Sequence, residues 1–165
     1  MKKMKLFFLP LCLLVVFSSC KKHSSDSVTA TGTITATIDG TPQTFNFGAT
    51  AHLDNTAGFN TLSIIGIKSA SASDSMIIEV TSASPIAAGT YTGANSEADM
   101  SYTITAGTLV YQFDGSNQAS STNVVISSIS ATSVQGTFNG TIELIYGSGP
   151  ASKTVTNGKF NLTIK

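Results

Sequence analysis

The stretch VQGTFNGTIELIY, residues 134–146, alternates in hydropathy with a period of two residues. Its odd positions up to Glu143 are polar, and its even positions are Val134, Gly136, Phe138, Gly140, Ile142, Leu144 and Tyr146. Because successive side chains of a strand point to opposite faces, this pattern predicts a β-strand with one buried face. Thirteen residues is long for a strand. The two glycines on its apolar face permit the sharp bending that a barrel or a strongly coiled sandwich needs.

Shorter stretches with the same period lie on both sides of this strand. Ile34, Ala36 and Ile38 alternate with threonines, and the Asp39-Gly40 pair that follows is a strong turn signal. A second alternating stretch breaks off at residues 54–58, and its apolar members are Phe45, Phe47, Ala49, Ala51 and Leu53. Further strands are expected near residues 59–68, 75–82, 100–106, 108–113 and 124–131.

The last strand is expected to contain a change of phase. Phe160, Leu162 and Ile164 share one parity, whereas Val155 has the other. A bulge or tight turn at Asn157-Gly158 would shift the phase by one residue and keep all four side chains inward.

About nine short strands at regular spacing, with no helical period after the first segment, predict an all-β fold. We expect one domain over residues 31–165, an antiparallel β-sandwich or a flattened β-barrel. Small residues on the inward parity leave two interpretations open, close packing or a cavity that holds a small apolar ligand. They are Ala49, Ala51, Gly136 and Gly140.

The first segment of the chain predicts export. Three lysines within the first five residues precede an apolar run at residues 6–17, which is too short to span a membrane. The sequence Phe17-Ser-Ser-Cys20 resembles the lipobox of bacterial lipoproteins. We therefore expect a cleaved signal peptide at residues 1–19, a lipid anchor on Cys20 and a flexible tether at residues 20–30. Ordinary cleavage near Ser19, with an incidental cysteine, is the alternative.

Composition excludes several function classes. After cleavage before Cys20, the chain would keep six lysines, nine acids and no arginine, so that nucleic acid is not an expected partner. Cys12 lies in the segment to be removed, and acylation would consume Cys20. No internal disulfide is then possible, and the β domain must be held together by its core.

Four stretches of the chain resemble a family of small bacterial envelope lipoproteins of unknown function. They are SSCKK, TATIDGTPQTF, PIAAGTYT and the ending VQGTFNGTIELI…KTVTNGKFNLTIK. The resemblance covers nearly the whole mature chain and implies a single all-β domain, anchored by lipid to the outer membrane. The family has no established catalytic residues that could be carried over to this sequence.

Motifs with specific chemistry are few. We find no GxSxG elbow, HExxH pair or phosphate-binding glycine loop, and predict no catalytic residue, metal site or cofactor besides the acyl anchor. Asp114-Gly-Ser-Asn resembles the start of a calcium loop, but turn chemistry explains it equally well. Ser27 and Ser75 follow aspartates in triplets that resemble a bacterial O-glycosylation signal.

Three other features are weak indications of binding. Threonines at positions 29, 31, 33, 35 and 37 would share one strand face, which suits a regular surface or simply a solvated strand. Phe59 and Tyr91 lie near loops, where an aromatic ring can stack on a sugar. His52 is expected on the solvent face of a strand, and Glu97 and Asp99 in a polar connection.

These patterns predict a non-catalytic envelope lipoprotein that binds a glycan or an envelope protein, or has a structural role. The alternatives are a carrier of a small apolar ligand and a glycan-processing hydrolase. A filled core would favour the binding module, a lined cavity the carrier, and an acid-lined cleft the hydrolase. The lysines next to Cys20 favour a position on the periplasmic face of the outer membrane, and a position on the surface face is the alternative.

Overall fold

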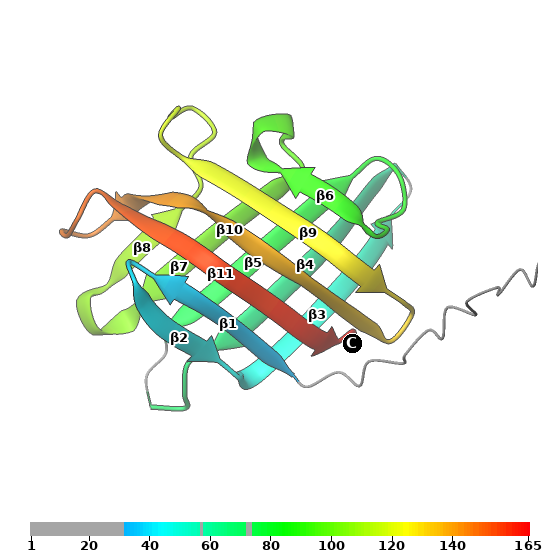
Figure 1. Ribbon diagram of the computed structural model, residues 1–165, viewed down its shortest axis with the longest axis horizontal. Coiled ribbons are helices and arrows are strands. Elements are labelled where there is room, and N and C mark those ends of the chain that lie inside the picture. Colours follow the sequence, from blue (N-terminus) through cyan, green and yellow to red (C-terminus); the bar gives the residue numbers. More distant parts are fainter. Residues whose placement is uncertain (1–31, 57, 72–73) are drawn as a thin grey trace, which may run out of the picture.

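Strands make up most of the part of the chain that the computed structural model describes, which is residues 32–56, 58–71 and 74–165 (Figure 1). The expected signal peptide, tether, Cys20 and Ser27 lie outside these residues, so the structure does not test them. Within the described residues, no helix is long and apolar enough to cross a membrane.

The structure has eleven strands and two single 3-10 turns. The strands are β1 (Thr33–Ile38), β2 (Thr41–Phe45), β3 (Phe47–Thr56), β4 (Phe59–Ile67), β5 (Ser75–Ser82), β6 (Gly89–Thr92), β7 (Ala98–Ile104), β8 (Leu109–Gln112), β9 (Ser121–Ile129), β10 (Ser133–Tyr146) and β11 (Ser152–Thr163). The turns are η1 (Gly93–Asn95) and η2 (Thr105–Gly107).

The strands form two layers that share β10. The hydrogen-bonded order is β2-β1-β11-β10-β8-β7-β5-β4-β3, and β9 and β6 branch off from β10. Residues 134–141 of β10 pair with β9, whereas residues 143–146 pair with β8. We call β2, β1, β11, β10, β9 and β6 the front sheet, and β8, β7, β5, β4 and β3 the back sheet. In Figure 1 the front strands run across the back strands.

The two layers are joined again at the end of β11, so that the sheet nearly closes into a flattened barrel. Ile164 forms a parallel bridge with Ala51 of β3. The Lys165 N–H donates to the Ala51 carbonyl at 2.9 Å, and the Thr50 hydroxyl donates to the Thr163 carbonyl. The prediction of one antiparallel, all-β domain is confirmed. The structure has two strands more than expected, because β2 is separate from β3 and β6 is an extra short strand.

Large side chains fill the space between the two sheets. Phe45 packs edge-on against Tyr102 at 5.9 Å between ring centroids, and Phe138 stacks with Phe160 at 6.4 Å. The largest fully buried side chains are Tyr111, Phe45, Phe138, Ile34, Leu62, Ile64, Met76, Ile78, Met100, Ile126, Ile142 and Leu162. The even positions of the 134–146 stretch are buried or half-buried up to Leu144, as the period predicts.

The predicted turn at Asp39-Gly40 and the predicted bulge at Asn157-Gly158 are both confirmed. Asp39 and Gly40 have φ of 47° and 79°, and Ile38 pairs with Thr41, which is the geometry of a two-residue hairpin. Asn157 has φ of 52°, and the β10–β11 register shifts beside it. Because of this bulge, Val155 and Phe160 both face the core.

Three details that we predicted from the hydropathy pattern are wrong. Phe47 is 51% exposed, because the chain turns a corner between β2 and β3, where Gly48 has φ of 61°. Tyr146 is 63% exposed, because β10 runs past the core at its end. The expected break at residues 54–58 belongs mostly to β3, which pairs with β4 up to Thr56.

Two buried hydroxyls have no hydrogen-bond partner among the described residues, Tyr111 Oη and Thr122 Oγ1. Leaving such a group unpaired costs about 1–3 kcal/mol. We therefore expect Tyr111→Phe to raise the free energy of unfolding by about 1 kcal/mol, since the ring under the Lys153 ammonium is kept. Denaturant titration measures the effect. A Tyr111→Phe variant less stable than the wild type would show that the hydroxyl has a partner.

The pKa of Tyr102 makes stability depend on pH in the alkaline range. Burial, together with the charge of Asp74 and with Tyr111, raises this pKa from 10.0 to about 12. The folded state thus favours the neutral phenol of Tyr102. Its contribution to the free energy of unfolding is complete below pH 10 and is lost as the pH rises to about 12. The loss amounts to about 2–3 kcal/mol. The free energy of unfolding, measured across this range, should fall less steeply with pH for Tyr102→Phe than for the wild type. Equal slopes for the two proteins would contradict the assignment.

Candidate functional site

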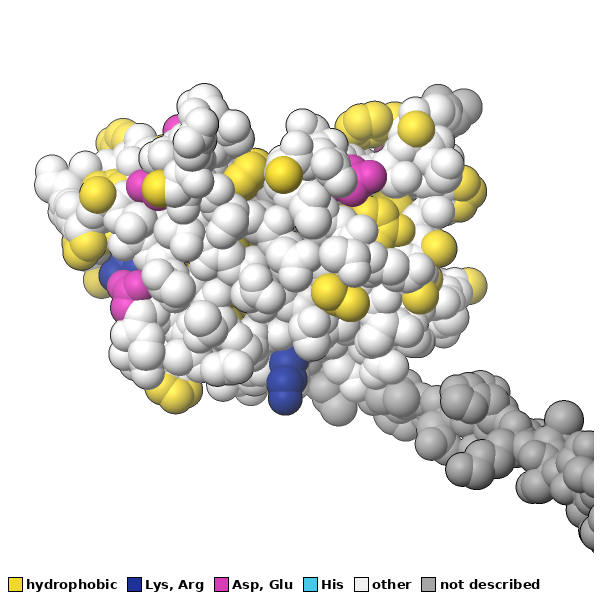
Figure 2. All heavy atoms as spheres, turned by 45° about the horizontal axis from the view of Figure 1, so that its top comes forward, with side chains coloured by type: hydrophobic (Ala, Val, Ile, Leu, Met, Phe, Trp, Pro, Cys, Tyr) yellow, Lys and Arg dark blue, Asp and Glu magenta, His cyan; other side chains and the backbone are white. Residues whose placement is uncertain are grey.

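Three adjoining hollows on the outer face of the back sheet form one cleft, which we call the upper cleft. Their volumes are about 370, 470 and 200 Å³. Thr81 and Ser96 line the first two hollows, and Glu79 and Asp99 line the first and third, so the three are continuous. Figure 2 turns the top of the molecule forward and shows a few acidic and hydrophobic side chains on that side among uncharged polar ones.

The floor of the upper cleft holds two carboxylates on neighbouring strands. Glu79 of β5 and Asp99 of β7 are directly opposite in the register. Both side chains point outward, because the residues on either side of each are buried. Like charges in this arrangement destabilise a sheet. The charges of this pair therefore do not stabilise the fold.

Hydrogen bonds fix the carboxylate of Asp99. Its Oδ1 accepts from the Met100 N–H at 2.6 Å, and its Oδ2 accepts from Nε2 of Gln112 at 2.9 Å. In this arrangement Asp99 is an acceptor at both oxygens. It is a positioned acceptor with lone pairs left for a ligand hydroxyl. No hydrogen bond to the Glu79 carboxylate is found within the described part of the chain.

Two phenyl rings line the cleft, Phe113 in the hollow that holds these acids and Phe59 in the adjoining one. Phe59, the first residue of β4, is 60% exposed because it lies at the end of the β3–β4 hairpin, outside the core. Phe113 lies half-buried over Gly93, where an added Cβ would come within 2.4 Å of the ring. Only glycine at position 93 therefore lets the Phe113 ring lie against the wall of the cleft.

Backbone hydrogen bonds hold the rim of the cleft to the back sheet. Ser96 adopts the left-handed conformation after η1 and donates to the Gly93 carbonyl. The Thr81 N–H donates to the Glu97 carbonyl, and its hydroxyl donates to the Ser96 carbonyl. The rim is thus positioned by β5 before any ligand arrives, which lowers the entropy cost of binding.

The structure bears out the predicted polar connection for Glu97 and not for Asp99. Glu97 lies between η1 and β7, whereas Asp99 lies within β7. The Asp114 carboxylate accepts hydrogen bonds from the Ser116 N–H and hydroxyl, and these bonds lower the pKa of Asp114. Turn chemistry therefore accounts for this motif. The described residues contain no group of three or more His, Cys, Asp or Glu side chains that could hold a metal ion.

The front sheet carries a further hollow of about 330 Å³. Thr33, Thr35 and Thr137 line it together with Lys159, over the buried Gly136. The threonine ladder is confirmed for positions 33, 35 and 37, which face outward between buried residues, while positions 29 and 31 lie outside the described residues. This hollow has no exposed ring to stack on a ligand, because Phe160 at its floor is buried.

The remaining candidate residues lie apart from the upper cleft or at its edge. Ser75 is the first residue of β5, half-buried and paired with Ile67 and Thr103, and not in the turn where the sequence placed it. His52 is on the solvent side of β3, as expected, and its ring bonds to the Lys165 carbonyl. The Tyr91 hydroxyl forms hydrogen bonds with the backbone N–H and carbonyl of Ala87, within its own loop.

Comparison with known proteins adds no relative. No family model matches the chain, and no curated protein or solved structure matches it either. The resemblance to envelope lipoproteins accordingly stays a prediction from the sequence.

Proposed function

We propose that this protein is a lipid-anchored component of the outer membrane and that its upper cleft binds a neutral glycan without cleaving it. The observation that carries the proposal is the combination found in the cleft. Phe113 presents a ring surface in the hollow that holds Glu79 and Asp99, and Phe59 presents one in the adjoining hollow that holds Glu97.

This combination fits the chemistry of a sugar ring. The C–H face of a pyranose packs on an aromatic ring, and its hydroxyls donate to carboxylates and amides. Asp99 is held in place by Gln112, so it can accept from a hydroxyl without reorganising. Asn95, Thr81 and Ser96 add polar groups along the same cleft.

The charges of the cleft select the class of glycan. Glu79, Glu97 and Asp99 line it, and no lysine does. A uronate or a sulfated sugar would be repelled by these carboxylates at short range. The cleft thus favours neutral chains or chains that carry amines.

The lipid anchor is proposed from the sequence around Cys20. The lipoprotein pathway attaches two or three acyl chains to its cysteine, whereas one chain binds only marginally. An anchored protein with a glycan-binding cleft would hold a polysaccharide, or the product of another enzyme, at the outer membrane.

Hydrolysis is the second candidate, because an acid-lined cleft is present. A glycosidase needs one carboxyl group that donates a proton and a second that assists. Asp99 accepts hydrogen bonds at both oxygens, so Glu79 would have to be the donor. Release of reducing ends from the glycan that binds would favour the hydrolase over the binding module.

A carrier function receives less support from the interior. The inward glycines that could have left room are packed closely instead. An added Cβ would come within 2.2 Å of the Val125 carbonyl oxygen at Gly136, and within 2.1 Å of the Ser121 carbonyl oxygen at Gly140. These contacts show close packing at both positions.

The test is a binding measurement with a matched pair of variants. The mature chain carrying Cys20→Ser is screened by calorimetry against neutral and acidic oligosaccharides. We expect Phe59→Ala to weaken binding of a neutral ligand about five- to ten-fold, since a stacked ring contributes about 1–1.5 kcal/mol. Phe47→Ala, which removes an equally exposed ring elsewhere, should have no effect. Equal affinities for both variants, or a preference for acidic glycans, would contradict the proposal.

A further inference from the structure

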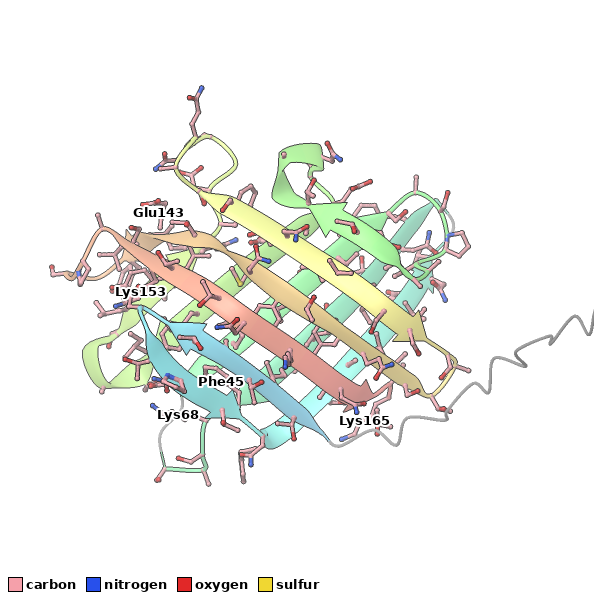
Figure 3. All side chains as sticks on the ribbon, in the orientation of Figure 1. Phe45, Lys68, Glu143, Lys153 and Lys165 are labelled. Carbon is pink, nitrogen blue, oxygen red and sulfur yellow. The ribbon has the colours of Figure 1, made fainter. Side chains whose placement is uncertain are left out.

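The chain enters the barrel at one end of the strands, which we call the lower end. The Gly32 N–H donates to the Asn161 carbonyl at 3.0 Å. An added Cβ at Gly32 would lie 3.9 Å from the Ala49 carbonyl oxygen, so the entry point is beside the start of β3. Figure 3 shows Lys68 and Lys165 along this same lower edge of the molecule.

Exposed apolar side chains gather on the back sheet at the lower end. Phe47 is 51% exposed and Ile65 is 38% exposed. Phe47 pairs with Ile67 across β3 and β4, and Ile65 pairs with Ile77 across β4 and β5. The outward-facing side chains of Phe47, Ile65 and Ile67 form the surface that we call the lower apolar patch, whereas Ile77 already lines the third hollow of the upper cleft.

We propose that the lower apolar patch rests on the surface of the bilayer and so orients the domain. This inference depends on the lipid anchor proposed at Cys20. Only the eleven residues from Lys21 to Thr31 separate the anchor from Gly32, and fully extended they reach at most about 40 Å. Such a short connection keeps the domain at a millimolar effective concentration near the membrane, so a weak contact is enough.

The distribution of charge favours this orientation. Lys68 and Lys165 lie at the lower end, where Asp74 partly offsets Lys68 at 3.9 Å. Among the acids of the upper cleft, Glu97 lies just before the start of β7, at the other end of the back strands, and Glu79 and Asp99 lie between the two ends. An anionic lipid surface attracts lysines near it and repels carboxylates. Aromatic and aliphatic side chains flanked by lysines are also what interfacial membrane contacts use.

The orientation has a consequence for the upper cleft. Phe59 and Ile67 are the two ends of β4, eight residues apart, which corresponds to about 26 Å along a strand. With the lower apolar patch on the bilayer, the Phe59 end of the cleft is the part that lies farthest from the lipid.

The absence of tryptophan from the sequence allows a direct test. Phe47→Trp and Phe59→Trp each place one fluorophore, at the lower and the upper end. Each full-length lipoprotein is reconstituted into vesicles of phosphatidylethanolamine and phosphatidylglycerol with brominated acyl chains, which quench tryptophan on contact. We expect several-fold stronger quenching for Phe47→Trp than for Phe59→Trp.

The possible outcomes separate the inference from the proposal on which it depends. Protein that does not float with the vesicles would show that the anchor is wrong. Protein that floats, with equal or no quenching of the two variants, would leave the anchor intact and overturn the orientation. Shielding of the Phe47→Trp fluorophore from acrylamide without lipid would show that a second copy covers the patch, which also overturns it.

Discussion

Replacing Gly136 by alanine is expected to lower the free energy of unfolding by about 3 kcal/mol, at the upper end of the usual cost of overpacking. The added Cβ would come within 2.2 Å of the Val125 carbonyl oxygen and 2.5 Å of the Phe160 ring. The first of these contacts is with the backbone of β9, which is paired with β10 on both sides of Gly136. The sheet must therefore shift, because a change of rotamer cannot relieve the contact.

The matched control for Gly136→Ala is Gly115→Ala. A Cβ at Gly115 would lie 3.5 Å from the Phe113 ring, which is ordinary van der Waals contact, and the residue is exposed. We expect Gly115→Ala to change stability by less than about 0.5 kcal/mol. Urea titrations of both variants against the wild type make the comparison. Similar midpoints for the two variants would show that β9 and β10 are not packed as described.

Replacing Cys20 by serine is expected to move the protein from the membrane fraction to the soluble fraction. The acyl chains on this cysteine would be the main source of membrane affinity, at about 0.8 kcal/mol for each buried methylene. Cell fractionation and metabolic labelling with an acyl analogue measure the effect. The contact of the lower apolar patch is too weak to hold the protein without the anchor.

Cys12→Ser is the control for this experiment, because Cys12 lies in the expected signal peptide. It should leave both labelling and fractionation unchanged. Retention of the Cys20→Ser variant in membranes would contradict the anchor. With anchoring established, protease treatment of intact cells shows which face the domain occupies, since only a surface-exposed domain is digested.

The fold could be predicted from the sequence wherever one strand face is buried. In such strands the period of two fixes which side chains point inward, as for Ile34 and Phe138. The prediction that Phe47 and Tyr146 face the core was wrong. The chain turns a corner at Phe47, and β10 runs past the core at Tyr146. Residue patterns within one strand contain no information about either event.

The candidate site was only partly accessible to sequence reasoning. Phe59 could be singled out because it follows a glycine at a strand start. The pairing of Glu79 with Asp99 could not, because it depends on β5 and β7 being neighbours although β6 lies between them in sequence. The alternating pattern shows only that each acid faces outward.

The central claim is that the upper cleft binds a neutral glycan, and a chemical-shift titration tests it most directly. Isotope-labelled mature chain carrying Cys20→Ser is titrated with neutral oligosaccharides, and its backbone amides are followed by NMR. The account predicts shifts at Phe59, Asn95, Ser96 and Asp99, with none at Phe47 or around Lys159. Shifts confined to the front sheet around Lys159, or no shift with any neutral oligosaccharide, would contradict it.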